Sequence, residues 1–308
     1  MSRIFALSDI HVDLTENMAF LEALSTEAFQ DDILILAGDV SHDLDRVAKA
    51  FACLQDRFAR IFFVPGNHDL WVRAANGQHS IDRLEGLLDL CRRSGVETEP
   101  ARTDEAAGSP WIVPLFSWYR MPEEGSDSLY VEKPGEDPEL RMWSDRRFVR
   151  WPDLHPHGSP ADYMHALNRS HLSTDFGPPV ITFSHFLPRT ELIFSTRHER
   201  RKWAHLGDPY PAFNFSRVAG CAGIDRQIRA AGASVHYYGH QHRNRCRHID
   251  GVTYISHCLG YPREREAGRG PAMADGPRLV WDGELVLESQ EQGGHAGSED
   301  RSLGAAAG

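Results

Sequence analysis

Short apolar runs alternate with segments of helical periodicity through the first hundred residues, and this alternation constrains the fold more than any other feature. The runs Ile4–Leu7, Ile33–Ala37 and Ile61–Val64 are continuous, which is typical of strands buried on both faces of a sheet. Between them, apolar residues recur three and four positions apart, which indicates helices. This order predicts an α/β fold with a mainly parallel sheet and right-handed crossovers.

The second half of the chain continues this pattern after an interruption. Further strands are expected at four apolar runs, Trp111–Phe116, Val180–Phe183, Val235–Tyr238 and Val252–Ser256. A hairpin is expected over residues 279–287, where Asp282-Gly283 separates two short apolar runs and favours a tight turn. The sequence therefore predicts a second group of strands rather than a helical domain.

The interruption covers residues 117–179, which are rich in Trp, Arg, Pro and Asp and have weak periodicity. The segment is too long for a simple connection, so we expect a cap-like insertion over a functional site. A surface insertion unrelated to substrate would have the same composition. Ser159-Pro160 predicts the start of a helix that continues to about Leu172. We expect one domain over residues 1–288 and a disordered, Gly- and Ala-rich tail over residues 289–308.

Polar motifs follow five of the predicted strands. They are Asp9-Ile-His11, Gly38-Asp39, Gly66-Asn67-His68-Asp69, Ser184-His185 and Gly239-His240-Gln241-His242. Ligands of open α/β sheets bind beyond the carboxyl ends of the strands. Because all five motifs occupy such positions, we expect them to meet in one site.

The residue types in these motifs favour a metal site. Aspartate, histidine and asparagine suit hard or borderline divalent cations, and a carboxylate such as Asp39 can bridge two of them. A single histidine is more often a surface or core residue than a ligand. Seven candidate ligands at five strand ends favour the metal interpretation, and these are Asp9, His11, Asp39, Asn67, His185, His240 and His242.

The order and spacing of the motifs resemble the signature of the calcineurin-like metallophosphoesterase superfamily, which runs D-x-H, GD, GNH[D/E], H and GH-x-H. The resemblance extends from Asp9 to His242. It implies a four-layer αββα sandwich of two mixed β-sheets flanked by helices, with a dinuclear site at the sheet edges. It also implies two metal ions, drawn from Mn, Fe and Zn.

Transferred to this chain, the resemblance assigns a set of ligands to each metal. The first set is Asp9, His11, Asp39 and His242, and the second is Asp39, Asn67, His185 and His240. Two cations about 3.5–4 Å apart would lower the pKa of a bridging water, and the resulting hydroxide would attack phosphorus in line. His68 is expected to face the phosphate as a general acid or charge stabiliser, with Asp69 orienting its imidazole.

Candidate substrate-binding residues lie outside the motifs. Arg146 and Arg147 belong to a basic cluster that is interleaved with aromatic residues, and Arg189 follows His185 closely. Guanidinium groups suit phosphate oxygens. A solvated face or an oligomer contact would explain the same arginines.

Charge and cysteine content limit the partners and the compartment of the chain. The formal net charge of −11 argues against a nucleic-acid partner, because such proteins normally carry a basic balance. The apolar run before Ser8 is too short for a signal peptide, and no stretch approaches the roughly 20 apolar residues of a membrane helix. Five cysteines without C-x-x-C spacing predict reduced thiols. We therefore expect a cytoplasmic protein without a membrane partner.

The leading hypothesis is a metal-dependent phosphomonoesterase that acts on a small phosphorylated molecule. A phosphodiesterase, for a cyclic nucleotide or another diester, is the alternative because the same pair of metals serves both reactions. A non-catalytic metal-binding scaffold is the alternative outside the enzymes. Such relatives usually lose a metal ligand or the histidine that corresponds to His68, and this chain keeps all of them.

Overall fold

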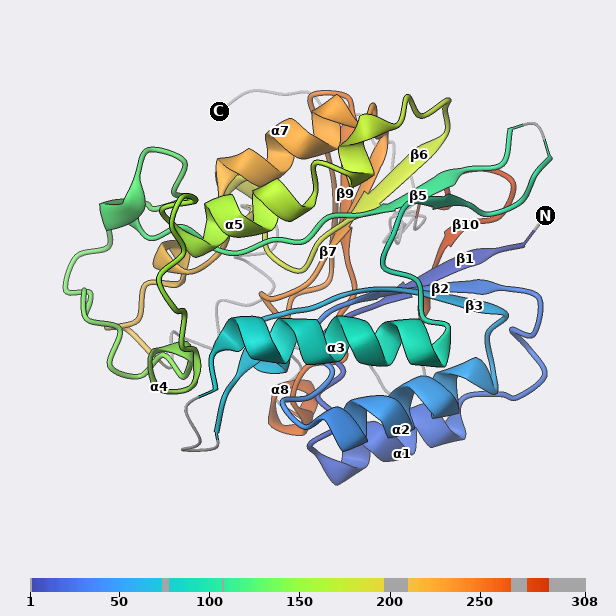
Figure 1. The fold of residues 1–308 in the computed structure, drawn as a ribbon, viewed down its shortest axis with the longest axis horizontal. Coiled ribbons are helices and arrows are strands. Elements are labelled where there is room, and N and C mark those ends of the chain that lie inside the picture. The colour runs from blue at the N-terminus through green and yellow to red at the C-terminus, as the bar shows by residue number, and fades with distance from the viewer. Residues whose placement is uncertain (1, 74–77, 107, 197–209, 267–275, 288–308) are drawn as a thin grey trace, which may run out of the picture.

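Two β-sheets pack face to face at the centre of the protein, and helices cover their outer faces (Figure 1). This computed structural model describes residues 2–73, 78–106, 108–196, 210–266 and 276–287. Both sheets are mixed, so the expected αββα sandwich is confirmed. The predicted tail at 289–308 lies outside the described residues. Within the described part of the chain, no helix has the length and apolarity that a membrane span requires.

The first sheet has the strand order β10-β1-β2-β3. Its strands are β1 (Ile4–Leu7), β2 (Ile33–Ala37), β3 (Arg60–Val64) and β10 (Arg278–Trp281). The three strands predicted from the N-terminal alternation are parallel, and β10 joins β1 antiparallel. A bridge between Trp281 and Leu285 closes the predicted turn after β10.

The second sheet has the strand order β4-β5-β6-β7-β9-β8. Its strands are β4 (Ala101–Arg102), β5 (Trp111–Pro114), β6 (Val180–Phe183), β7 (Val235–Tyr238), β8 (Arg245–Ile249) and β9 (Val252–Ser256). The four predicted strands are parallel to one another, and β4 and β8 are antiparallel edge strands. The apolar pattern missed β8, because an edge strand with an exposed face carries arginine and histidine.

Each sheet has its own helical layer. The first is covered by α1 (Thr15–Ala23), α2 (Leu44–Gln55) and α3 (Ser80–Ser94). The second is covered by α5 (Pro160–Leu167) and α7 (Ala222–Ala230), which lie side by side in Figure 1. The short helix α4 (Asp145–Phe148) lies away from these layers. A second short helix, α8 (Pro262–Glu266), lies beside the first layer, where Arg265 donates a hydrogen bond to Asn17 of α1 at 2.8 Å.

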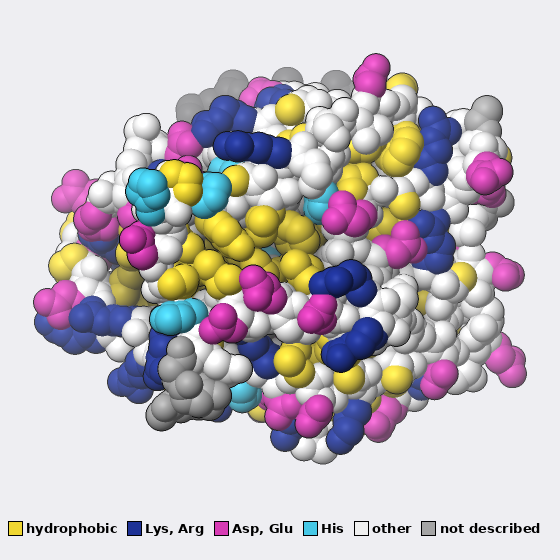
Figure 2. All heavy atoms as spheres, in the orientation of Figure 1, with side chains coloured by type: hydrophobic (Ala, Val, Ile, Leu, Met, Phe, Trp, Pro, Cys, Tyr) yellow, Lys and Arg dark blue, Asp and Glu magenta, His cyan; other side chains and the backbone are white. Residues whose placement is uncertain are grey.

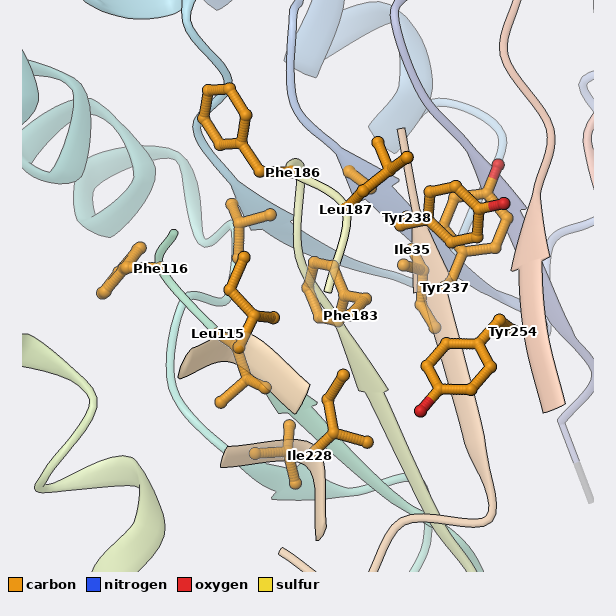
Figure 3. Close-up of a cluster of buried hydrophobic side chains, with 14 of the residues drawn as sticks. Ile35, Leu115, Phe116, Phe183, Phe186, Leu187, Ile228, Tyr237, Tyr238 and Tyr254 are labelled. Carbon is orange, nitrogen blue, oxygen red and sulfur yellow. The ribbon is translucent and has the colours of Figure 1, made fainter. Parts of the chain in front are cut away.

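Alternation of side chains along the strands divides the core into two clusters. In β2, Leu34 and Leu36 pack under the helices of the first layer, whereas Ile33 and Ile35 face the second sheet. Figure 3 shows Ile35 beside Phe183, with the second-sheet tyrosines nearby. Because both faces of the strand are covered, its sequence is apolar without interruption.

The 117–179 segment serves two parts of the structure. Its C-terminal part forms α5, which ends at Leu167 rather than near Leu172 and packs against α7. The Gln227 side chain donates a hydrogen bond to the His165 carbonyl at 3.2 Å across this contact. The part around α4 lies beyond the carboxyl ends of the strands in Figure 1, where a cap would lie. A cap over the site therefore stays a prediction, and it concerns the first part of the segment.

Candidate metal centre

The five motifs meet where the strands of both sheets end. Asp9 and His11 follow β1, Asp39 follows β2, and Asn67 follows β3. His185 follows β6, and His240 with His242 follows β7. Each motif lies at the carboxyl end of its strand, as predicted from the sequence.

The backbone of this region is held in an uncommon conformation. Five residues of the motifs have positive φ angles, namely Asp9 (51°), His11 (39°), Asp39 (57°), His240 (73°) and His242 (50°). The left-handed region costs roughly 1–3 kcal/mol for each residue other than glycine, and such residues cluster at functional sites. The conformation turns these side chains toward a common centre instead of along the strands.

The glycines of the motifs allow the loops to approach one another. A Cβ atom on Gly66 would lie 2.2 Å from Asp39 Oδ1, and one on Gly239 would lie 2.7 Å from Asp9 Oδ2. Any other residue at these two positions would push a candidate ligand out of place. The glycines therefore belong to the site through close packing.

The first set of candidate ligands converges on one point. The ligand atoms of Asp9, His11, Asp39 and His242 all lie within 4.8 Å of one another. His242 Nε2 lies 3.1 Å from His11 Nε2 and 3.3 Å from Asp9 Oδ1. Nitrogen and oxygen donors that face each other across such distances fit a shared cation.

The second set adjoins the first through Asp39. His185 Nε2 lies 3.5 Å from Asp39 Oδ1 and 3.1 Å from Asn67 Oδ1. His185 Nδ1 is bound to the carbonyl of Ala37 at 2.9 Å, so Nε2 is the atom turned to the site. His240 is held through Nε2 by the carbonyl of Val218 at 2.9 Å, which leaves Nδ1 as its candidate ligand atom.

Burial sets the charge of these groups. It raises the pKa of Asp39 well above the usual range, and the neighbouring Asp9 and Asp69 carboxylates add to this effect. Burial also lowers the pKa of His11, His185 and His240, so their imidazoles are neutral and able to bind a cation. A nearby positive charge would stabilise the ionised form of Asp39, and the donor set therefore fits divalent metal.

His68 lies beside the two sets. Its backbone N–H donates to Asp39 Oδ1 at 2.9 Å, and its ring stacks on Trp71 at 3.6 Å between centroids. His68 Nε2 lies 4.0 Å from Asp39 Oδ2 and 3.2 Å from the Tyr261 hydroxyl. This position allows the imidazole to face a substrate, as expected from the motif.

Asp69 has a different role from the predicted one. Its carboxylate accepts hydrogen bonds at 2.8–2.9 Å from the backbone amides of Asp39, Val40, Ser41 and Gly66. The short helical turn at His68–Leu70 directs the side chain back toward the loop after β2, where three of these amides lie, and toward the Gly66 amide in its own loop. Asp69 therefore holds two motif loops together, and it does not orient the His68 imidazole.

We expect Asp69→Ala to lower the free energy of unfolding by about 2–4 kcal/mol, because four amides would lose their acceptor. The measurement is urea denaturation of the metal-free protein. Asp104→Ala is the matched control, since exposed Asp104 accepts one backbone hydrogen bond among the described residues, from Ala106. Equal losses in the two variants would contradict this role for Asp69.

Two carboxylates at the site had no motif to reveal them. Glu264 in α8 accepts a hydrogen bond from His242 Nδ1 at 2.7 Å, which directs Nε2 of that ring toward Asp9. Asp145 in α4 accepts from Asn67 Nδ2 at 2.9 Å and from Trp71 Nε1 at 2.6 Å. Asp145 thus connects the 117–179 segment with a candidate ligand, and the amide oxygen of Asn67 remains directed at His185.

We expect Glu264→Ala to weaken metal binding by roughly 10- to 100-fold, the usual effect of removing a carboxylate that orients a histidine ligand. Glu264→Gln keeps an acceptor oxygen and should lose less. Competition with a fluorescent chelator measures the affinity. Glu266→Ala, at an exposed position of the same helix, is the control. An unchanged affinity in Glu264→Ala would contradict the proposed role.

The candidate substrate-binding arginines differ in whether their charge is already balanced by carboxylates. The Arg189 guanidinium lies 2.6–3.3 Å from the carboxylates of Glu191, Asp225 and Asp250, so its charge is already balanced. Arg146 contacts Glu139, and the exposed Arg147 lies beside it in α4. Figure 2 shows basic side chains gathered around α4. Arg146 and Arg147 remain candidates for binding an anion, whereas Arg189 is an ion-pair residue.

Comparisons with known proteins identify the family of this chain. The sequence profile of the family described as calcineurin-like phosphoesterase matches residues 2–244. The chain is 29% identical over 276 residues to the acyl-carrier-protein phosphodiesterase PptH of Mycobacterium tuberculosis, covering 85% of this chain and 78% of that protein. The crystal structure of phosphopantetheinyl hydrolase PptH from Mycobacterium tuberculosis matches with a TM-score of 0.68 and 26% identity, covering 91% of this chain and 95% of that chain.

Proposed function

This chain belongs to the calcineurin-like phosphoesterase family and is a hydrolase of phosphoric esters, and we propose that its substrate is a phosphodiester. The likeness to PptH over 85% of the chain carries this proposal. The phosphodiester proposal replaces the phosphomonoester hypothesis of the sequence analysis. The family motifs serve both reactions and cannot choose between them, whereas the likeness to PptH favours a diester. A carrier protein that bears phosphopantetheine is the proposed substrate class.

The proposed metal ligands form two sets that share Asp39. One set adds Asp9, His11 and His242, and the other adds Asn67, His185 and His240. Bound divalent ions would polarise the phosphate and provide a nucleophile from water near neutral pH. The protein contributes the buried carboxylates that balance this charge and the hydrogen bonds that orient each imidazole.

His68 is the group proposed to act on the leaving oxygen. A phosphopantetheinyl diester joins two alkyl oxygens, and an alkyl alkoxide is a poor leaving group unless it is protonated. The His68 ring is packed against Trp71 and lies beside Asp39, where it can present a proton to that oxygen. Trp71 is itself anchored through its indole N–H by Asp145.

The test compares substrates on one Mn-reconstituted preparation. Mass spectrometry of a phosphopantetheine-bearing carrier protein detects loss of the phosphopantetheine group, and nitrophenyl phosphate and bis-nitrophenyl phosphate report monoester and diester hydrolysis. We expect the carrier protein and the diester to be cleaved, with Asp39→Asn as the inactive control. Preference for the monoester would overturn the proposal. Cleavage of the diester without cleavage of the carrier protein would contradict the proposed substrate class and leave the phosphodiesterase activity standing.

A further inference from the structure

Tyr261 lies at the metal centre although it follows β9, beyond the residues that match the family. Its ring stacks on His11 at 4.6 Å between centroids with an interplanar angle of 24°. The same ring meets His242 edge-on at 5.0 Å. Tyr261 therefore covers two candidate ligands at once.

The backbone that carries Tyr261 is tied to the first motif. Leu259 N–H donates to the Ser8 carbonyl, and Gly260 N–H donates to the Asp9 carbonyl, each at 3.0 Å. Tyr261 N–H donates to Glu264 Oε2 at 2.8 Å, and this carboxylate also holds His242. These bonds place the tyrosine ring by the same framework that places the candidate ligands.

The hydroxyl reaches His68 at the nitrogen that faces the centre. Tyr261 Oη lies 3.2 Å from His68 Nε2, the same atom that lies 4.0 Å from Asp39 Oδ2. Trp71 stacks on the His68 ring, so two aromatic residues limit its rotation. Stacking fixes the plane of the His68 ring, and the hydrogen bond from Tyr261 also fixes which ring nitrogen, Nε2 or Nδ1, faces the centre.

We propose that Tyr261 is a positioning residue that keeps Nε2 of His68 directed at the leaving oxygen of the substrate. The inference rests on the proposed function, in which His68 transfers a proton from Nε2 to that oxygen. A water oxygen forms a new bond to phosphorus and its proton passes to solvent. The ester P–O bond breaks, its electron pair stays on the leaving oxygen, and that oxygen takes the Nε2 proton of His68. Solvent then returns the proton. Between turnovers, the Tyr261 hydroxyl is hydrogen-bonded to His68 Nε2. When the substrate binds, its leaving oxygen replaces the hydroxyl as the partner of Nε2.

Tyr261→Phe tests this role because it keeps the ring on His11 and removes only the hydroxyl. We expect kcat for an alkyl phosphodiester to fall roughly 3- to 30-fold, the effect of losing one hydrogen bond to a group whose charge changes. KM and metal content should not change. A nitrophenyl diester, whose leaving group needs little protonation, should lose less. Equal losses for both esters would overturn the proposal.

A double-mutant cycle separates positioning from packing. In a His68→Ala background, Tyr261→Phe should have no further effect on kcat, because its partner is absent. Additive losses would show that the hydroxyl acts independently of His68 and would overturn the inference. If the wild-type protein cleaves no diester, the proposed function fails instead, and the two failures are thereby distinguished.

Nitrogen NMR of histidine-labelled apoprotein gives a readout that does not depend on activity. The His68 signals are assigned by their loss in His68→Ala. We expect Tyr261→Phe to shift the Nε2 signal or its tautomer balance, and unchanged signals would overturn the contact. Tyr254→Phe is the matched control, since the Tyr254 hydroxyl is bound to Asp225 in another part of the second sheet.

Discussion

Asp39→Ala is expected to abolish hydrolysis and to reduce bound metal below one equivalent per chain. Asp39 lies between both proposed ligand sets, with Oδ2 3.8 Å from His11 Nε2 and Oδ1 3.5 Å from His185 Nε2. Its removal would take charge and a donor atom from both sites together. Elemental analysis and diester turnover measure the two effects.

Asp39→Asn refines this test, because it keeps an oxygen that can accept the His68 backbone hydrogen bond but lacks the charge. We expect it to lose metal as well. Asp45→Asn, at an exposed position in α2, is the control for removal of one negative charge. A variant that still holds two metals and turns over normally would show that Asp39 is not the bridge.

His68→Asn is expected to keep both metals while lowering turnover of an alkyl diester by roughly 10²–10⁴-fold, the range for loss of a general acid or base. The Asp39 contact survives because the His68 backbone amide donates it. The loss should be smaller for a nitrophenyl diester, which needs less protonation. Metal content and kcat for the two esters are measured on one preparation.

The outcomes of this experiment assign the role of His68. Loss of metal together with activity would make His68 a ligand or a structural support. An equal loss for both esters would leave it as a charge stabiliser only. Trp71→Phe is a comparison variant. It keeps an aromatic ring against His68 but removes the indole N–H that donates a hydrogen bond to Asp145. It should lose less activity than His68→Asn.

The sequence alone predicted the parts of the fold whose residues carry a local pattern. Continuous apolar runs identified β1, β2 and β3, because a strand covered on both faces is composed mostly of apolar residues. The apolar pattern did not predict the edge strand β8, because its exposed face carries the polar residues that are typical of a loop. The seven candidate ligands were found because metal chemistry restricts each of them to a few residue types.

The remainder of the site was decided by the tertiary structure. Asp145 reaches Asn67 across 78 positions, and Tyr261 reaches His68 across 193. Nothing local to an acidic residue in the 117–179 segment, or to a tyrosine after a strand, distinguishes these positions from many others.

Asp69 shows that tertiary contacts also decide roles within a motif. The sequence suggested that its carboxylate binds the adjacent His68, whereas the carboxylate binds backbone amides of the loop after β2. The sequence by itself determined which chemistry the strand ends carry, since residue type limits the metals and reactions that a site supports. Packing alone decided which side chains orient that chemistry, because a hydrogen bond depends on where distant segments meet.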